Sequence, residues 1–172
     1  MFSARGVIER DNYYQRIYAK TASLFEMSSL AASMVATEDE EMRGSMKSFG
    51  YEVGMAFQIV DDILDFTGEQ SAVGKPIGSD LLNGLVTLPA IYFAEANPGD
   101  EDVLSLPGGG WKDTDRVQRL VDGIRQSEAI HQSMDEARQS VERAIGALED
   151  APESPEKEAL EDLARFIVDR KV

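Results

Sequence analysis

Apolar residues recur every three to four positions along most of the chain, and this spacing predicts α-helices. A first helical stretch is expected over residues 8–36, whose middle is rich in Ala and Ser. A second long helix is marked by the apolar stripe Met42, Met46, Phe49, Val53, Phe57, Val60 and Leu64. We expect this helix to begin at Thr37, which has capping-box spacing to Glu40, and to end at Gly68.

Glycine and proline residues divide the next part of the chain into shorter segments. Residues 69–79 and 97–112 contain several turn formers and are predicted to be loops. Between them, residues 80–96 return to a helical pattern, in which Pro89 is expected to cause a kink. A short helix is expected from about Asp115 onward.

Two further helices are predicted in the remaining sequence. The first is marked by Ile130, Met134, Ala137, Val141, Ala144 and Leu148. The second should begin with Ser154 as its N-cap and Pro155 in the first helical position. Because runs of alternating β-branched residues are absent, no sheet is expected. The predicted fold class is therefore all-α: a bundle of long antiparallel helices in a single domain over residues 1–172.

Composition excludes several classes of function. The 172 residues are 42% hydrophobic, which suits one globular domain with a substantial core. Seventeen Lys and Arg against 32 Asp and Glu give a net charge of −15, which argues against nucleic acid or an anionic membrane as the partner. The sequence has no cysteine and one histidine, so disulfides, thiolate chemistry and a histidine-based zinc site are not expected.

A membrane span or signal peptide is not expected either. The best apolar run, residues 24–36, is interrupted by Glu26 and several serines and is too short to cross a bilayer. A cytoplasmic location is the simplest interpretation.

The segment 55–89 carries the strongest chemical signal. On a helix, Asp61 and Asp65 share a face, Gln58 lies one turn earlier on the same side, and Asp62 lies about 100° round the axis. Neighbouring like charges repel unless something neutralises them, and Mg²⁺ needs only one or two carboxylates besides waters and substrate phosphates. The spacing therefore predicts a magnesium–diphosphate site. A solvated acidic face is the alternative, although the apolar residues around the acids favour the site.

Two lysines could assist such a site. Lys75 lies in the glycine-flanked segment 74–78, where glycine would let the backbone approach a phosphate and lysine would supply a charge. This segment does not match a Walker loop, and an ordinary turn with an exposed lysine is the alternative. Lys20 and Thr21 open a run of small and apolar residues. Lys20 could extend to solvent or point into a cavity beside the aspartates, and periodicity does not choose between these.

Together these segments resemble the trans-isoprenyl diphosphate synthases, also called polyprenyl synthetases. The resemblance is carried by YAKTA at 18–22, GMAFQIVDDILD at 54–65, GKPIGSDL at 74–81, TLP at 87–89 and ARFIVDR at 164–170. The combination of FQxxDDxxD with a following GKP is specific, because terpene cyclases share aspartate-rich helices but not this combination.

The resemblance implies an isoprenoid-synthase-like bundle of long helices around a deep cavity, with two aspartate-rich motifs facing each other. Mg²⁺ would bridge the motifs to an allylic diphosphate, which ionises and is attacked by isopentenyl diphosphate. The implied roles are Mg²⁺ binding for Asp61, Asp62 and Asp65, diphosphate binding for Lys20, Gln58 and Lys75, and catalysis for Lys20, Thr21, Gln58 and Asp61. Asp61 would bind the metal most directly, and the oxygens of Thr21 and Gln58 would lie near the allylic cation.

Two departures from the family pattern matter. Leu85 stands where the family often has lysine. The first aspartate motif belongs upstream of Lys20, and 19 residues precede Lys20 in this sequence. We therefore expect the chain to be the C-terminal half of such a prenyltransferase, forming a homo-oligomer such as a homodimer or pairing with a chain that supplies the N-terminal half. The alternative is a non-catalytic partner subunit, or a fragment that is inactive alone.

Overall fold

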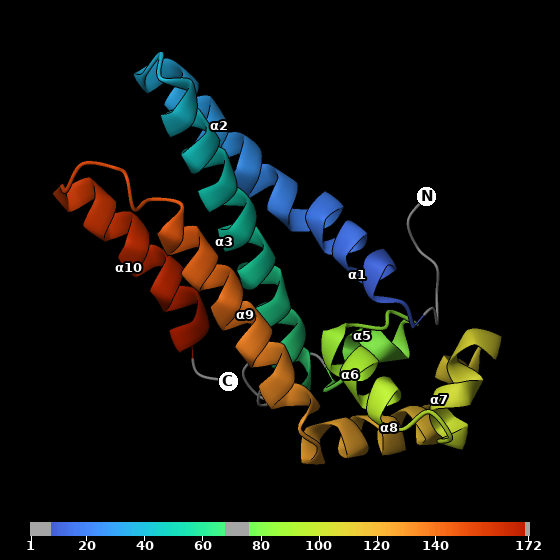
Figure 1. Cartoon of the computed structure of the whole chain (residues 1–172). Coiled ribbons are helices and arrows are strands. Elements are labelled where there is room, and N and C mark those ends of the chain that lie inside the picture. Colours follow the sequence, from blue (N-terminus) through green and yellow to red (C-terminus); the bar gives the residue numbers. More distant parts are fainter. Residues whose placement is uncertain (1–7, 68–75, 171–172) are drawn as a thin grey trace. The chain divides into compact units, whose positions relative to one another are not determined.

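The computed structural model describes residues 8–67 and 76–170 (Figure 1). Over these residues the secondary structure is helical without a β-strand, which confirms the all-α prediction. The α-helices are α1 (Arg10–Ile17), α2 (Ser23–Ala36), α3 (Glu40–Thr67), α5 (Ser79–Leu82), α6 (Leu88–Ala96), α7 (Glu101–Ser105), α8 (Thr114–Gln126), α9 (Ala129–Gly146) and α10 (Pro155–Asp169). A π-helical turn, Tyr18–Ala22, joins α1 to α2. None of the described helices is long and apolar enough to cross a membrane.

The described residues group into two compact units. The first unit comprises residues 8–16, 61–67 and 76–133, and the second comprises residues 17–60 and 134–170. Helices α3 and α9 contribute residues to both units. A single domain over residues 1–172 stays a prediction.

In the first unit, α8 packs against α5, α6 and α7. One face of α8 is fully apolar and buried, and it consists of Val117, Leu120, Val121 and Ile124. Gly78, which precedes α5, has φ +71°, and a Cβ there would lie 2.3 Å from a methyl of Val121. The close approach of this turn to α8 therefore requires glycine on both conformational and steric grounds.

In the second unit, α2, α3, α9 and α10 lie side by side (Figure 1). Arg143 of α9 makes a two-pronged ion pair with Glu52 of α3, with N–O distances of 2.9 Å. The guanidinium of Arg170, after α10, lies over the ring of Phe57 at 4.6 Å from its centroid. The buried apolar residues of this unit include Ile17, Ala22, Phe49, Val53, Ala56, Ile59, Ala137, Val141, Ala144, Leu148, Ala164 and Ile167.

The predicted cap of the second long helix was wrong by two residues. Helix α3 begins at Glu40, and Asp39 caps it by accepting hydrogen bonds from the amides of Glu41 (2.9 Å) and Met42 (3.3 Å). The hydroxyl of Thr37 instead accepts from the amide of Asp39 at 3.1 Å. A carboxylate two residues later thus takes the capping role that the Thr37 spacing suggested. The predicted end at Gly68 lies outside the described residues.

The helix predicted over residues 80–96 is interrupted. Helix α5 ends at Leu82, and a turn with Gly84 at φ +77° precedes α6. Pro89 therefore does not kink a helix but lies in the first turn of α6, where its missing amide hydrogen costs nothing. The prediction of a kink was wrong because the helix is interrupted between Leu82 and Leu88, before the proline.

The loop predicted over residues 97–112 also contains helical structure. Asp100 caps α7 by accepting from the amides of Asp102 (2.8 Å) and Val103 (3.0 Å). The predictions for α8 and α10 are confirmed: α8 begins at Thr114, and Ser154 caps α10 by accepting from the amide of Lys157 at 3.1 Å.

Candidate functional site

Thr21 and Gln58 are brought together in the second unit. Thr21 lies in the π-helical turn, and its hydroxyl donates a 2.7 Å hydrogen bond to the side-chain oxygen of Gln58 on α3. Gln58 is buried, with 4% of its surface exposed, whereas Lys20 in the same turn is exposed. A hydroxyl that donates its proton keeps its lone pairs, so the Thr21 oxygen retains the negative end of its dipole.

Two glycines allow the π-helical turn and the first part of α2 to approach α3 this closely. A Cβ at Gly54 would lie 2.6 Å from the Cα of Ala22, and a Cβ at Gly50 would lie 2.5 Å from the carbonyl oxygen of Phe25. Real Cβ atoms essentially never make contacts this short, so any side chain at either position would move the backbone. Glycine at these positions therefore fixes the distance across which Thr21 reaches Gln58.

The three aspartates of α3 have different surroundings in the first unit. Asp61 and Asp65 are partly exposed, whereas Asp62 is buried, with 4% of its surface exposed. Among the described residues, no three acidic, histidine or cysteine side chains are grouped so that they could hold a metal ion. The aspartates therefore do not form a ready three-carboxylate site. Their hard oxygen donors still fit Mg²⁺, which takes one or two carboxylates from a protein.

Asp62 lies against the hydroxyl of Tyr13 from α1, which is itself 1% exposed. Burial, and then the charge and hydrogen bonding of Asp62, raise the pKa of Tyr13 well above its usual value. Next to them, the guanidinium of Arg16 donates a 2.6 Å hydrogen bond to the carbonyl oxygen of Val86. Asp62 thus belongs to a buried polar contact between α1 and α3, a role that motif spacing does not indicate.

Asp65 organises the segment that leads into α5. Its carboxylate accepts hydrogen bonds from the Ser79 hydroxyl (2.7 Å) and the Asp80 amide (3.1 Å). Its backbone carbonyl accepts from the Gly78 amide at 2.8 Å. The third aspartate of the motif therefore joins the end of α3 to the start of α5.

Replacing Asp65 with Ala is expected to lower the free energy of unfolding by about 2 kcal/mol, because hydrogen bonds to a charged group are worth more than neutral ones. Ser79→Ala removes only one of these bonds and should cost about 1 kcal/mol. Urea unfolding followed by circular dichroism measures both. Equal stabilities of Asp65→Ala and wild type would show that this carboxylate does not hold the start of α5.

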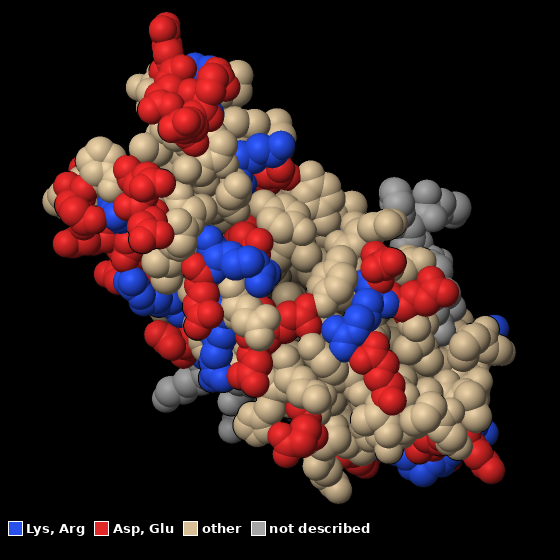
Figure 2. All heavy atoms as spheres, viewed as in Figure 1, with Lys and Arg blue, Asp and Glu red and all other residues tan. Residues whose placement is uncertain are grey.

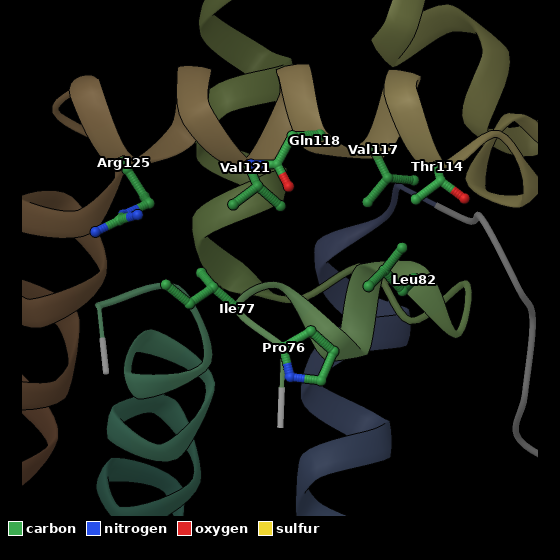
Figure 3. Close-up of a pocket in the computed structure, with 8 residues that line it drawn as sticks. All are labelled: Pro76, Ile77, Leu82, Thr114, Val117, Gln118, Val121 and Arg125. Atoms are coloured by element: carbon green, nitrogen blue, oxygen red, sulfur yellow. The ribbon is translucent and has the colours of Figure 1, made fainter. Parts of the chain in front are cut away.

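Lys75 lies outside the described residues, so its predicted role stays a prediction. The residues directly after it contribute to a cavity of about 250 Å³ in the first unit (Figure 3). Its lining consists of Pro76, Ile77, Leu82, Thr114, Val117, Gln118, Val121 and Arg125. Sequence reasoning missed this cavity, because its only signal is the apolar face of α8. The predicted site residues that the structure describes are not part of its lining.

Acidic side chains gather in the second unit where α2 is joined to α3 (Figure 2). This cluster comprises Glu38, Asp39, Glu40 and Glu41. The net charge of −15 repels an anionic ligand unless cations intervene. A diphosphate site in this chain therefore depends on metal ions or lysines.

Residues 2–124 match the family described as polyprenyl synthetase. The chain belongs to this family. It is 35% identical over 159 residues to "Heptaprenyl diphosphate synthase component 2" of Bacillus subtilis (strain 168), a match that covers 92% of this chain and 45% of that protein. The resemblance inferred from the aspartate, lysine and glutamine motifs is thereby confirmed.

Two solved structures of polyprenyl synthetases show the same fold. Heptaprenyl diphosphate synthase from Staphylococcus aureus has a TM-score of 0.92 and 29% identity, covering 99% of this chain and 54% of that chain. Polyprenyl synthase from Caulobacter crescentus CB15, complexed with calcium and isoprenyl diphosphate, has a TM-score of 0.87 and 32% identity, covering 100% of this chain and 53% of that chain. The chain thus spans about half the length of these relatives.

Proposed function

We propose that this chain supplies the second aspartate-rich motif of a trans-prenyltransferase in isoprenoid biosynthesis. The enzyme would condense isopentenyl diphosphate with an allylic diphosphate and lengthen the allylic chain by one isoprene unit. The observation that carries the proposal is one uninterrupted helix, α3, on which Gln58 precedes Asp61, Asp62 and Asp65 at motif spacing, with Gln58 held by Thr21. Membership of the polyprenyl synthetase family supports it.

In this proposal Asp61 is the principal ligand for Mg²⁺, because Asp62 is buried against Tyr13 and Asp65 holds Ser79 and Asp80. When bound, Mg²⁺ would neutralise charge on the leaving diphosphate. Calcium and isoprenyl diphosphate in the relative from C. crescentus support a divalent cation and a diphosphate as ligands.

The other predicted site residues have complementary roles in the proposed reaction. Lys20 and Lys75 bind the allylic diphosphate and stabilise it as the allylic carbon–oxygen bond breaks. Thr21 and Gln58 direct oxygen dipoles toward the resulting cation, which they stabilise without forming a covalent bond. The double bond of isopentenyl diphosphate then forms the new carbon–carbon bond, and the loss of a proton completes the condensation.

The partner of this chain is also part of the proposal. The chain spans about half of its relatives, and one relative is named as component 2 of a heptaprenyl diphosphate synthase. We propose either a homo-oligomer or a complex with a chain that supplies the N-terminal half of the family fold, in the cytoplasm. The second candidate function, a non-catalytic partner subunit, rests on the same half-length coverage and is no better supported by it.

Radiolabelled isopentenyl diphosphate, an allylic diphosphate and Mg²⁺ test the proposal. The chain is assayed alone and mixed with the N-terminal half of the B. subtilis relative. Lengthened product in the mixture only would support the half-enzyme, whereas product from the chain alone would support a self-sufficient homo-oligomer. If neither sample gives product but calorimetry detects Mg²⁺-dependent binding of inorganic diphosphate, the non-catalytic subunit is favoured. Absence of both product and binding would contradict the proposed site.

A further inference from the structure

A side-chain hydrogen bond spans the π-helical turn that carries Lys20 and Thr21. The hydroxyl of Tyr18, at the start of the turn, donates to Oε2 of Glu26 in α2 at 2.6 Å. Residues eight apart on an uninterrupted α-helix lie about 80° apart around the axis. A π-helical turn accommodates one extra residue, so Glu26 takes the angular position that the seventh residue would have and lies on the same face as Tyr18.

The backbone shows the same irregularity. The amide of Ser23 donates to the carbonyl oxygen of Tyr18, five residues earlier, which is the bond that defines a π-helix. The Tyr18–Glu26 bond therefore begins at the first residue of the widened turn and ends in the regular helix beyond it. The bond therefore bridges the π-helical turn. If the turn became regular α-helix, the Tyr18 and Glu26 side chains would no longer lie on the same face and the bond would be lost.

Glu26 is also anchored to α3. It is 8% exposed, and its carboxylate lies 3.4 Å from the ammonium of Lys47 on α3. The Tyr18 ring contacts the Tyr51 ring of the same helix, with 5.8 Å between centroids. A buried carboxylate is costly unless hydrogen-bonded and paired, so Tyr18 and Lys47 account for the burial of Glu26 within the second unit.

We propose that Tyr18 and Glu26 are positioning residues, which hold the π-helical turn and thereby hold Thr21 against Gln58. Conversion of the turn to regular α-helix would rotate its first residue by about 100° relative to α2, and Lys20 and Thr21 would rotate part of the way with it. Such a rotation would take the Thr21 hydroxyl away from Gln58. The importance of this contact for catalysis rests on the proposed prenyltransferase function. The stabilisation of the π-helical turn by Tyr18 and Glu26 does not depend on that function.

Amide hydrogen exchange of the full chain tests directly whether Tyr18 and Glu26 stabilise the π-helical turn. Tyr18→Phe and Glu26→Ala should speed exchange of the Ser23 amide at least tenfold, with little change in residues 30–36. Glu26→Gln keeps an acceptor for the Tyr18 hydroxyl and should give a smaller effect than Glu26→Ala. Tyr51→Phe is the matched control, because it removes a hydroxyl from the neighbouring ring and should leave Ser23 unchanged. Tyr18→Phe retains the ring contact, so this variant keeps the test valid if Glu26→Ala does not fold.

Unchanged Ser23 exchange in Tyr18→Phe would overturn the proposal, whatever the enzyme activity. If the prenyltransferase assay gives product, Tyr18→Phe should lower kcat at least tenfold while the KM for isopentenyl diphosphate stays within twofold. Faster Ser23 exchange with unchanged kcat would confine the role of the pair to the turn and overturn its part in catalysis. If wild type gives no product, alone or in the mixture, and does not bind diphosphate, the proposed function is contradicted. Faster Ser23 exchange in the variants would still support the role of Tyr18 and Glu26 in holding the turn.

Discussion

Gly54→Ala is expected to lower the free energy of unfolding by about 2 kcal/mol, although Ala favours helix more than Gly. The added Cβ would lie 2.6 Å from the Cα of Ala22 and 3.0 Å from its Cβ. Because the nearest atom belongs to the backbone, α3 and the π-helical turn must separate to admit the methyl group. Urea unfolding of the variant and wild type measures the difference.

Gly44→Ala, in the same helix, is the matched control. Among the described residues, nothing lies within 4 Å of a Cβ at Gly44, so this substitution should raise stability by about 0.5–1 kcal/mol through helix propensity. Opposite signs at the two glycines would establish the close approach of the helices. A gain of stability at Gly54 as well would show that the contact with Ala22 is looser than 2.6 Å.

Separation of α3 from the π-helical turn should also lengthen the Thr21–Gln58 contact. Gly54 lies one turn before Gln58 on α3, and its contact residue Ala22 directly follows Thr21. Gly54→Ala should therefore weaken the 2.7 Å hydrogen bond between Thr21 and Gln58. In this region, helix packing and the geometry of the candidate site depend on the same glycine.

Helix periodicity predicted the long elements because burial of one apolar face is a repeating property of the sequence. Of the predicted stripe, Phe49, Val53 and Val60 are buried in α3. The other four members are half-buried: Met42, Met46, Phe57 and Leu64. The helix boundaries were less predictable, since several nearby residues compete to cap the same amides. Asp39 rather than Thr37 caps α3, and Pro89 lies in the first turn of α6 rather than kinking a longer helix.

The candidate site was predictable only as far as motif spacing determines it. The spacing that placed Gln58 and the aspartates on one helix is confirmed by α3. The burial of Asp62 against Tyr13 and the bond from Ser79 to Asp65 depend on which distant segments pack there. The π-helical turn likewise depends on local backbone geometry that a 3.6-residue period does not contain.

Asp61→Asn is expected to weaken Mg²⁺-dependent binding of inorganic diphosphate about 100-fold, an effect of the size seen when a metal site loses a supporting group. The substitution keeps the side chain's shape and one oxygen but removes the charge that a divalent cation requires. Asp61 is partly exposed, unlike the buried Asp62, so this change should leave stability nearly unchanged. Isothermal calorimetry with and without Mg²⁺ measures the loss, on the chain alone or on its active mixture.

Asp122→Asn is the matched control for the loss of one negative charge. Asp122 is exposed on α8, where it accepts a 3.1 Å hydrogen bond from Gln118, and asparagine can accept the same bond. Its diphosphate binding should equal that of wild type. Asp65→Asn distinguishes metal binding from the structural role of Asp65. Its main effect should be on the segment that the Asp65 carboxylate holds through Ser79 and Asp80. If Asp65→Asn weakens Mg²⁺-dependent binding more than Asp61→Asn at equal stability, Asp65 rather than Asp61 is the principal metal ligand.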